Sequence, residues 1–220
     1  SVRDIARALD IQGASLYAHV ASKQDVLRVI VERMAARLEE AADEALKAID
    51  SASANDAATR LAALVRAHVG VVTDDLERAT VFVYEWRSLD ADSRARMAGR
   101  RDAYERRFRS IVSDGVESGA FAAVDATAAA AFILTALDGL VAWYRPDGRL
   151  RPDQVADAYA DLAVRAATGP EGSDPPGSPG DRRRWSGRIR NRSARRRTDR
   201  AWEPRVVARV NHPKNEWMFN

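Results

Sequence analysis

The first 23 residues, SVRDIARALDIQGASLYAHVASK, constrain the fold more than any other part of this chain. The apolar residues of the first predicted helix recur at the spacing of one buried helix face: Val2, Ile5, Ala6 and Leu9. Asp10 interrupts that pattern, and a second short helix follows Gly13, with Leu16 and Val20 one turn apart. Two short helices joined by a tight turn predict a helix-turn-helix unit, which places its second helix in the major groove of DNA.

This stretch resembles the DNA-binding head of the TetR-type transcriptional repressors. The resemblance rests on the runs RDIARALDI, QGASLY, HV and SK. It is specific over the first 28 residues and extends more loosely, through helix number and spacing, to about residue 168. It implies a regulator that binds a double-stranded operator through two groups of residues: Ser15, Tyr17, His19 and Lys23 on phosphates, and Arg3, Gly13 and Ala14 at base edges.

Two positions depart from the family pattern. Asp10 stands in the turn where the family usually has Gly, and Asp enters the left-handed backbone region more readily than most residues. No helix precedes Ser1, where the family has the first helix of a three-helix head, so we expect a partial head. Two interpretations stay open: an operator-binding repressor, or a ligand-binding and dimerisation module that has lost DNA binding. Tyr17 is likewise either a phosphate contact, which the nearby His19 favours, or a structural aromatic.

After the head, apolar residues keep a helical spacing and no alternating strand pattern is found. Ser22 with Asp25 forms a capping-box-like helix start, and Asp125 is a second helix cap. Gly119 is typical of a helix end and Pro152 of a helix beginning. The sequence therefore predicts an all-α fold with helices over residues 23–49, 55–72, 74–89, 92–118, 125–144 and 152–168.

The segment 126–144 is apolar enough to raise the question of a membrane span, since nineteen residues carry one charge, Asp138. Its many alanines are weakly hydrophobic and no basic flank precedes it, which favours a packed helix in a protein without membrane contact. The family resemblance implies that this helix and the last one form a four-helix homodimer interface, in which we place Ala130 and Leu162. A buried Asp138 needs a partner: a ligand, the second subunit or an arginine.

Large aromatic residues cluster in the middle of the body, and most are expected in the core. Pockets between bundled helices nevertheless bind small molecules. The segments VFVYEWRSLD, RRDAYERRFR and LDGLVAWYRPDG resemble those of TetR-type repressors that sense acyl-CoA thioesters or other lipid metabolites. The resemblance implies an amphiphilic effector whose phosphate or carboxylate end meets Arg101, Arg145 or Arg106, unless these arginines only cover solvated helix faces. The predicted ligand-binding residues are Phe82, Trp86, Phe108, Leu137, Trp143, Arg101 and Arg145.

Charge divides the chain. From residue 170 on there are thirteen Lys and Arg against six Asp and Glu, whereas the residues before it carry 22 against 26. The Pro-, Gly-, Ser- and Arg-rich end predicts a disordered tail, which is either a nucleic-acid arm or a solvated extension. We therefore predict three parts: a partial head over 1–28, a regulatory body over 29–168 and a basic tail over 169–220.

Other site chemistries find little support. The chain has no cysteine, which fits a reducing cytoplasm. His68 lies on an apolar face with no second ligand one turn away, so a core histidine is favoured over a metal ligand. No phosphate-binding glycine loop or nucleophile elbow occurs, so we expect neither an enzyme nor a cofactor. The sequence predicts a cytoplasmic, dimeric, ligand-responsive transcriptional repressor.

Overall fold

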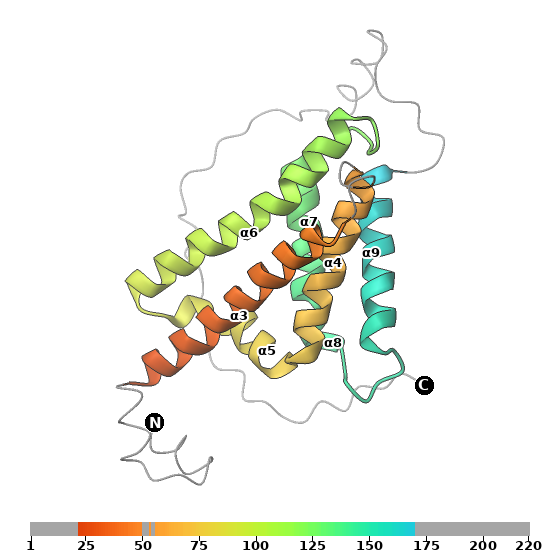
Figure 1. Ribbon diagram of the computed structural model, residues 1–220. Helices are drawn as coiled ribbons and strands as arrows, with labels where there is room; N and C mark the ends of the chain where they lie inside the picture. Colours follow the sequence, from red (N-terminus) through yellow and green to blue (C-terminus); the bar gives the residue numbers. More distant parts are fainter. Residues whose placement is uncertain (1–21, 50–52, 54–55, 170–220) are drawn as a thin grey trace, which may run out of the picture. The chain divides into compact units, whose positions relative to one another are not determined.

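The computed structural model describes residues 22–49, 53 and 56–169, whose regular secondary structure is entirely helical (Figure 1). The all-α prediction is therefore confirmed for this part of the chain. The elements, in order, are α3 (Lys23–Lys47), α4 (Ala57–Asp74), α5 (Leu76–Glu85), the 3-10 turn η1 (Trp86–Ser88), α6 (Ala91–Glu117), α7 (Ala126–Asp138), α8 (Leu140–Trp143) and α9 (Pro152–Thr168). Residues 1–21, which carry most of the helix-turn-helix predicted over residues 1–23, and residues 170–220 of the predicted tail lie outside the described residues. The boundary predicted after residue 28 falls inside the continuous helix α3.

Local chemistry sets the helix ends as the sequence predicted. The Ser22 hydroxyl accepts a hydrogen bond from the Asp25 N–H at 3.1 Å and donates one to the Asp25 carboxylate at 2.9 Å. Asp125 accepts from the Ala128 N–H at 2.8 Å at the start of α7. Gly119, just beyond α6, has φ +77°, a left-handed conformation that glycine adopts without a steric penalty.

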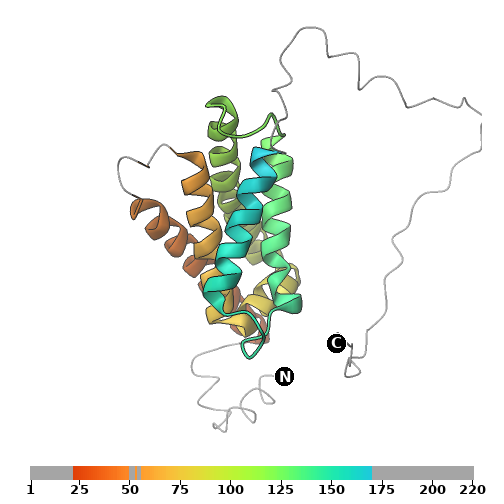
Figure 2. The ribbon, with the colours of Figure 1, turned by 90° about the vertical axis from the view of Figure 1, so that its right-hand side faces the viewer.

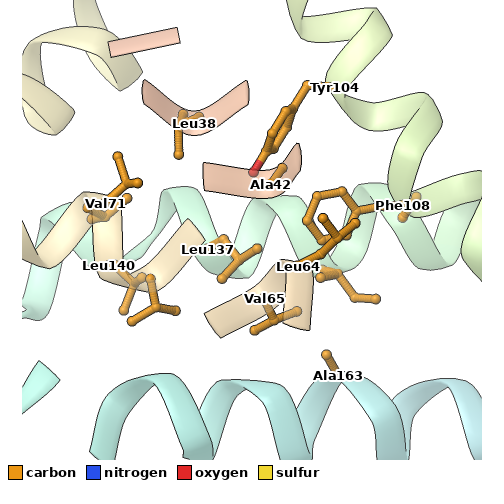
Figure 3. Close-up of a cluster of buried hydrophobic side chains, with 14 of the residues drawn as sticks. Leu38, Ala42, Leu64, Val65, Val71, Tyr104, Phe108, Leu137, Leu140 and Ala163 are labelled. Atoms are coloured by element: carbon orange, nitrogen blue, oxygen red, sulfur yellow. The ribbon is translucent and has the colours of Figure 1, made fainter. Parts of the chain in front are cut away.

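Helix α4 is the centre of the body because it is apolar on more than one face. It packs against α3, α6 and α9, and Figure 1 shows it between α3 and α9. Leu61, Leu64 and Val65 are completely buried on α4. Figure 3 shows Leu64 in one cluster with Phe108 of α6 and Leu137 of α7. The body is therefore held by one contiguous apolar core to which every long helix contributes.

The predicted helix 74–89 is shorter and ends differently. Asp75 separates α4 from α5 with non-helical backbone angles and caps α5 by accepting from the Arg78 N–H at 3.1 Å. At the other end, α5 tightens into η1, whose last turn closes with a hydrogen bond from the Leu89 N–H to the Trp86 carbonyl. Leu89 itself is buried. This turn positions the Trp86 side chain at the site described below.

The predicted helix 125–144 is divided into α7 and α8 at Gly139. Gly139 keeps right-handed helical angles and its N–H donates to the Thr135 carbonyl at 3.0 Å, so the interruption is slight. The stretch Ala126–Trp143 has the length and apolarity of a membrane span, with 28% of it buried in the body. Figure 2 shows α9 beside α7. Part of the apolar surface of α7 therefore stays uncovered within one protomer.

Candidate functional site: a cavity among helices α3 to α7

Most of the predicted DNA contacts lie outside the described residues: Ser15, Tyr17 and His19 for phosphates, and Arg3, Gly13 and Ala14 for bases. Lys23 is described. It is the first residue of α3 and is exposed, next to the Ser22 cap. An exposed cation at this place is free to reach a phosphate, but its role stays a prediction.

A cavity of about 360 Å³, the main cavity, opens where helices α3 to α7 meet. Its wall combines apolar and aromatic side chains with seven charged residues. The lining residues are Ala35, Leu38, Glu39, His68, Phe82, Trp86, Arg87, Ala98, Arg100, Arg101, Asp102, Tyr104, Glu105, Ala131, Leu134, Thr135 and Asp138. Helix α6 contributes most of the polar ones.

An ion pair crosses the main cavity from α6 to α7. The Arg101 guanidinium donates to the Asp138 carboxylate at 2.8 Å, and both side chains are about three-quarters buried. The same guanidinium lies 5.2 Å from the ring centroid of Phe82 and 5.4 Å from that of Trp86. Of the partners predicted for Asp138, the arginine is therefore the one that the protomer supplies.

His68 and Tyr104 form a second polar pair in the wall. His68 Nδ1 lies 3.2 Å from the Tyr104 hydroxyl, and both side chains are buried. Burial lowers the pKa of His68 to about 4, because the charged imidazolium is poorly solvated there. Burial likewise raises the pKa of Tyr104. At neutral pH both groups are uncharged, and the prediction of a hydrogen-bonded core histidine is confirmed.

The indole of Trp86 lacks a hydrogen-bond partner. Its Nε1 is buried, and among the described residues it is the one buried side-chain nitrogen or oxygen without a partner. The Arg87 guanidinium lies 4.5 Å from the centroid of the same ring. Buried polar groups in proteins are nearly always paired, so an unpaired one in a cavity wall needs an explanation.

Several contacts connect α6 and η1 to α3, and the first of them, between Arg100 and Glu39, joins two residues that line the main cavity. Arg100 of α6 grips the Glu39 carboxylate with two nitrogens, at 2.7 and 2.9 Å, and donates to the Glu32 carbonyl at 3.2 Å. Farther along, Arg107 donates to the Glu39 carbonyl at 3.2 Å. At the start of α3, the Gln24 amide donates to the Ser88 carbonyl of η1 at 3.1 Å.

The structure brings three of the seven predicted ligand-binding residues, Phe82, Trp86 and Arg101, to the main cavity. The other four lie elsewhere. Phe108 and Leu137 are completely buried in the apolar core (Figure 3). Trp143 is 45% exposed and donates its Nε1–H to the Tyr159 hydroxyl at 3.0 Å. Arg145 is exposed and donates to the Tyr144 carbonyl at 2.9 Å, and Arg106 is also exposed outside the lining.

Sequence reasoning missed several lining residues. Tyr104 lies three residues after Arg101 on α6 and Arg100 four residues before Tyr104, so a helical wheel that includes Tyr104 would have placed all three near one face. His68 was expected in the core but not at a cavity. Glu39 gave no local signal, because its role depends on Arg100, which lies 61 residues away.

A second depression, the α7–α9 groove, holds about 320 Å³ on the apolar face of the body. Its lining residues are Val124, Asp125, Ala128, Ala129, Phe132, Ile133, Ala166 and Ala167. Phe132 and Leu162, on α7 and α9, are 64% and 62% exposed. Ala130, which the sequence placed at a subunit interface, is completely buried in the protomer instead, because it points from α7 into the core.

Residues 54–167 match the family described as tetracyclin repressor-like, C-terminal domain. The chain is 26% identical over 176 residues to the HTH-type transcriptional repressor KstR2 of Rhodococcus jostii (strain RHA1), covering 77% of this chain and 82% of that protein.

Solved structures of regulators from the same family are also similar to this chain. PfmR, a TetR family regulator of Thermus thermophilus, is 32% identical with a TM-score of 0.67, over 75% of this chain and 87% of its own. AibR in complex with isovaleryl coenzyme A and operator DNA is 26% identical with a TM-score of 0.64, over 77% and 88%. The match includes most of each relative's length.

Proposed function

Because this chain belongs to the tetracycline repressor-like family of transcriptional regulators, we propose that it is a DNA-binding repressor released from its operator by a small amphiphilic ligand in the main cavity. The observation that carries the proposal is the cavity itself. Its volume of about 360 Å³ suits a small molecule, and its wall combines apolar and aromatic surface with polar groups that can fix the orientation of a ligand. The family consists of regulators rather than enzymes, and we expect the protein in the cytoplasm.

The ligand class follows from the wall and from the relatives. Leu38, Phe82 and Leu134 offer an apolar surface, while Trp86 and Arg101 offer hydrogen-bond donors. AibR, a similar structure, is described in complex with isovaleryl coenzyme A. We therefore propose an acyl-CoA thioester or another lipid metabolite, contacted by Phe82, Trp86 and Arg101. Phe108, Leu137, Trp143 and Arg145 are left out of this site because they do not line the cavity.

The main cavity is connected to the DNA-binding end of the chain through η1. Trp86, in the wall, begins this turn, and Ser88, two residues on, accepts the hydrogen bond from Gln24 in the first turn of α3. Helix α3 follows directly on the segment predicted to bind DNA. A ligand lowers the affinity for DNA only to the extent that it binds the DNA-free arrangement of the protein more tightly than the DNA-bound one. A ligand in contact with Trp86 could produce such a difference, because η1 connects Trp86 to α3.

The α7–α9 groove supports a homodimer. Phe132 and Leu162 are large apolar side chains left exposed by the protomer, and the alanines around them allow close helix approach. We propose that α7 and α9 pack against the same helices of a second copy in a symmetric interface. Such a dimer presents two DNA-binding heads to half-sites about 34 to 36 Å apart.

A salt-dependent binding assay tests the DNA-binding part of the proposal. The full chain is titrated onto DNA from the region upstream of its own gene, with Lys23→Ala as the variant and Lys47→Ala, at the other end of α3, as the matched control. Loss of one phosphate contact should flatten the slope of log affinity against log salt by about one in Lys23→Ala only. Absence of any salt-dependent binding would instead support a ligand-binding and dimerisation module.

The same assay with added octanoyl-CoA tests induction. We expect Trp86→Ala to keep the affinity for DNA while weakening release by the ligand, because Trp86 lines the cavity and not the DNA surface. A saturating acyl-CoA that raises the melting temperature of the protein without lowering its DNA affinity would refute induction by this ligand.

A further inference from the structure

Trp86, in the wall of the main cavity, has a hydrogen-bond donor without an acceptor among the described residues. Trp86 Nε1 is buried and unpaired, and the indole is a donor only. Its ring is flanked by the guanidinium groups of Arg87 and Arg101, neither of which can accept a hydrogen bond. Burying an N–H without an acceptor is unfavourable, and an acceptor supplied by a ligand removes that penalty.

Two of the three arginines that line the main cavity are already paired with carboxylates, and the lining as a whole carries more acidic than basic residues. Arg101 is paired with Asp138, and Arg100 is held at two nitrogens by Glu39. Four acidic residues line the cavity against three basic ones. A carboxylate or phosphate that binds Arg100 or Arg101 would have to displace the carboxylate already paired there and would then lie close to it. An uncharged oxygen avoids both costs.

We propose that the main cavity recognises an uncharged carbonyl oxygen, bound by the Trp86 indole N–H, and that it selects carbonyl compounds over free carboxylates. The inference rests on the proposed function, because it names the part of the effector that the repressor reads. Arg87 also lies against the indole and is exposed, so its movement would open a path to Nε1 that leaves the Arg101–Asp138 pair intact. Two sources supply such a carbonyl: the thioester of an acyl chain, whose charged carrier stays outside the cavity, and the ketone of a lipid or steroid.

The test compares ligands that share an acetamide group and differ only in the thioester carbonyl next to the acyl chain. Binding of S-octanoyl-N-acetylcysteamine and of the thioether S-octyl-N-acetylcysteamine is measured by calorimetry on the full chain, without DNA. Wild type should prefer the thioester by about three- to tenfold, the range of one hydrogen bond. Trp86→Phe keeps an aromatic ring but loses the N–H, so the preference should disappear. Trp143→Phe is the matched control, because the N–H of Trp143 is bound to Tyr159 outside the cavity.

Further probes separate the sources. Tighter binding of octanoyl-CoA than of androstenedione identifies the thioester, and the reverse order identifies the ketone. The inference is overturned if neither carbonyl class binds, if octanoate binds more tightly than the thioester, or if Trp86→Phe keeps the full carbonyl preference. Should Trp86→Phe fail to fold, equal affinities of thioester and thioether for wild type would overturn it equally well.

DNA release, measured in the same samples, distinguishes this inference from the proposed function. Carbonyl-selective binding that depends on Trp86 but leaves DNA affinity unchanged would refute induction and keep the inference. Release of DNA by a ligand whose binding does not depend on the Trp86 N–H would keep the proposed function and refute the inference.

Discussion

The main cavity and the α7–α9 groove differ little in size, about 360 and 320 Å³, but their walls differ completely. Seven charged residues and two hydrogen-bonded aromatic groups line the cavity, whereas the groove has alanines, branched aliphatic residues, Phe132 and a single charge, Asp125. Asp125 is occupied in capping α7. A small molecule needs a few polar groups that fix its orientation, while a partner subunit needs apolar surface that allows close approach. Wall chemistry, more than volume, therefore separates the two uses.

The largest effect is expected in the groove region. Leu162→Arg places a charge without a partner on the exposed apolar face of α9, and association of two subunits there should weaken by about 3 kcal/mol or more. Sedimentation velocity over a range of concentrations measures the dimer. The control is Tyr84→Arg on α5, because the Tyr84 side chain is about as exposed as that of Leu162 but lies outside the α7–α9 groove. This variant should leave the dimer intact. A dimeric Leu162→Arg protein would place the interface on another surface.

The second largest effect is a dependence of the protein's stability on pH, caused by His68 in the wall of the main cavity. The pKa of His68 is about 4 in the folded protein and about 6.5 in the unfolded chain. Between these values only the unfolded chain takes up the proton, so stability is full above pH 6.5 and falls as pH is lowered toward 4. The loss should reach at most about 3 kcal/mol.

Urea unfolding of wild type and His68→Gln between pH 7 and 4 isolates this contribution from the carboxylates, which titrate in both proteins. The variant should be less stable at pH 7, because it loses the contact with Tyr104, but should lose less stability on acidification. Parallel pH profiles would mean that the pKa of His68 is the same in the folded protein as in the unfolded chain.

The smallest effect tests whether the Arg101–Asp138 ion pair disfavours the binding of a carboxylate in the main cavity. Asp138→Asn removes the partner of Arg101, and because this pair is partly exposed the stability should fall by only about 1 kcal/mol. Binding of octanoate should improve at the same time, since Arg101 becomes available to a carboxylate. Asp161→Asn breaks the exposed pair with Arg165 on α9 and should change neither property. Unchanged octanoate binding in Asp138→Asn would show that Arg101 does not face the ligand.

Local features of this fold were predictable because the interactions behind them are local. Ser22, Asp125 and Gly119 act on backbone groups within one helical turn, and the helix ends they predicted agree with the structure to within two residues. The break at Gly139 was missed because its backbone stays helical. Helix α5 was predicted too long because apolar residues keep helical spacing through η1 to Leu89, and this spacing does not distinguish a 3-10 turn from an α-helical one.

The cavity could be predicted only in part. Helical spacing indicates that Phe82 and Phe108 both point inward. It does not show which side chain is packed completely by other residues and which one borders a cavity. Phe108 is packed completely, whereas Phe82 borders the cavity. The partner of Asp138 lies 37 residues away, and no period in the sequence connects the two. Ala130 and Phe132 are two positions apart on α7 and therefore point to nearly opposite sides of the helix. Ala130 is buried in the core and Phe132 is exposed, so a prediction that assigns the wrong side of α7 to the core exchanges the two.

The contacts of Arg100 and Arg107 with α3 have a mechanical consequence. Each guanidinium holds a main-chain carbonyl oxygen of α3, at Glu32 and Glu39, as well as a carboxylate. Sliding α3 along α6 by one residue would break all of these bonds together. Tilting it about them strains each bond slightly. The Gln24 end of α3 lies eight residues beyond Glu32, so a small rotation of α3 about these contacts would displace that end more than the contacts themselves.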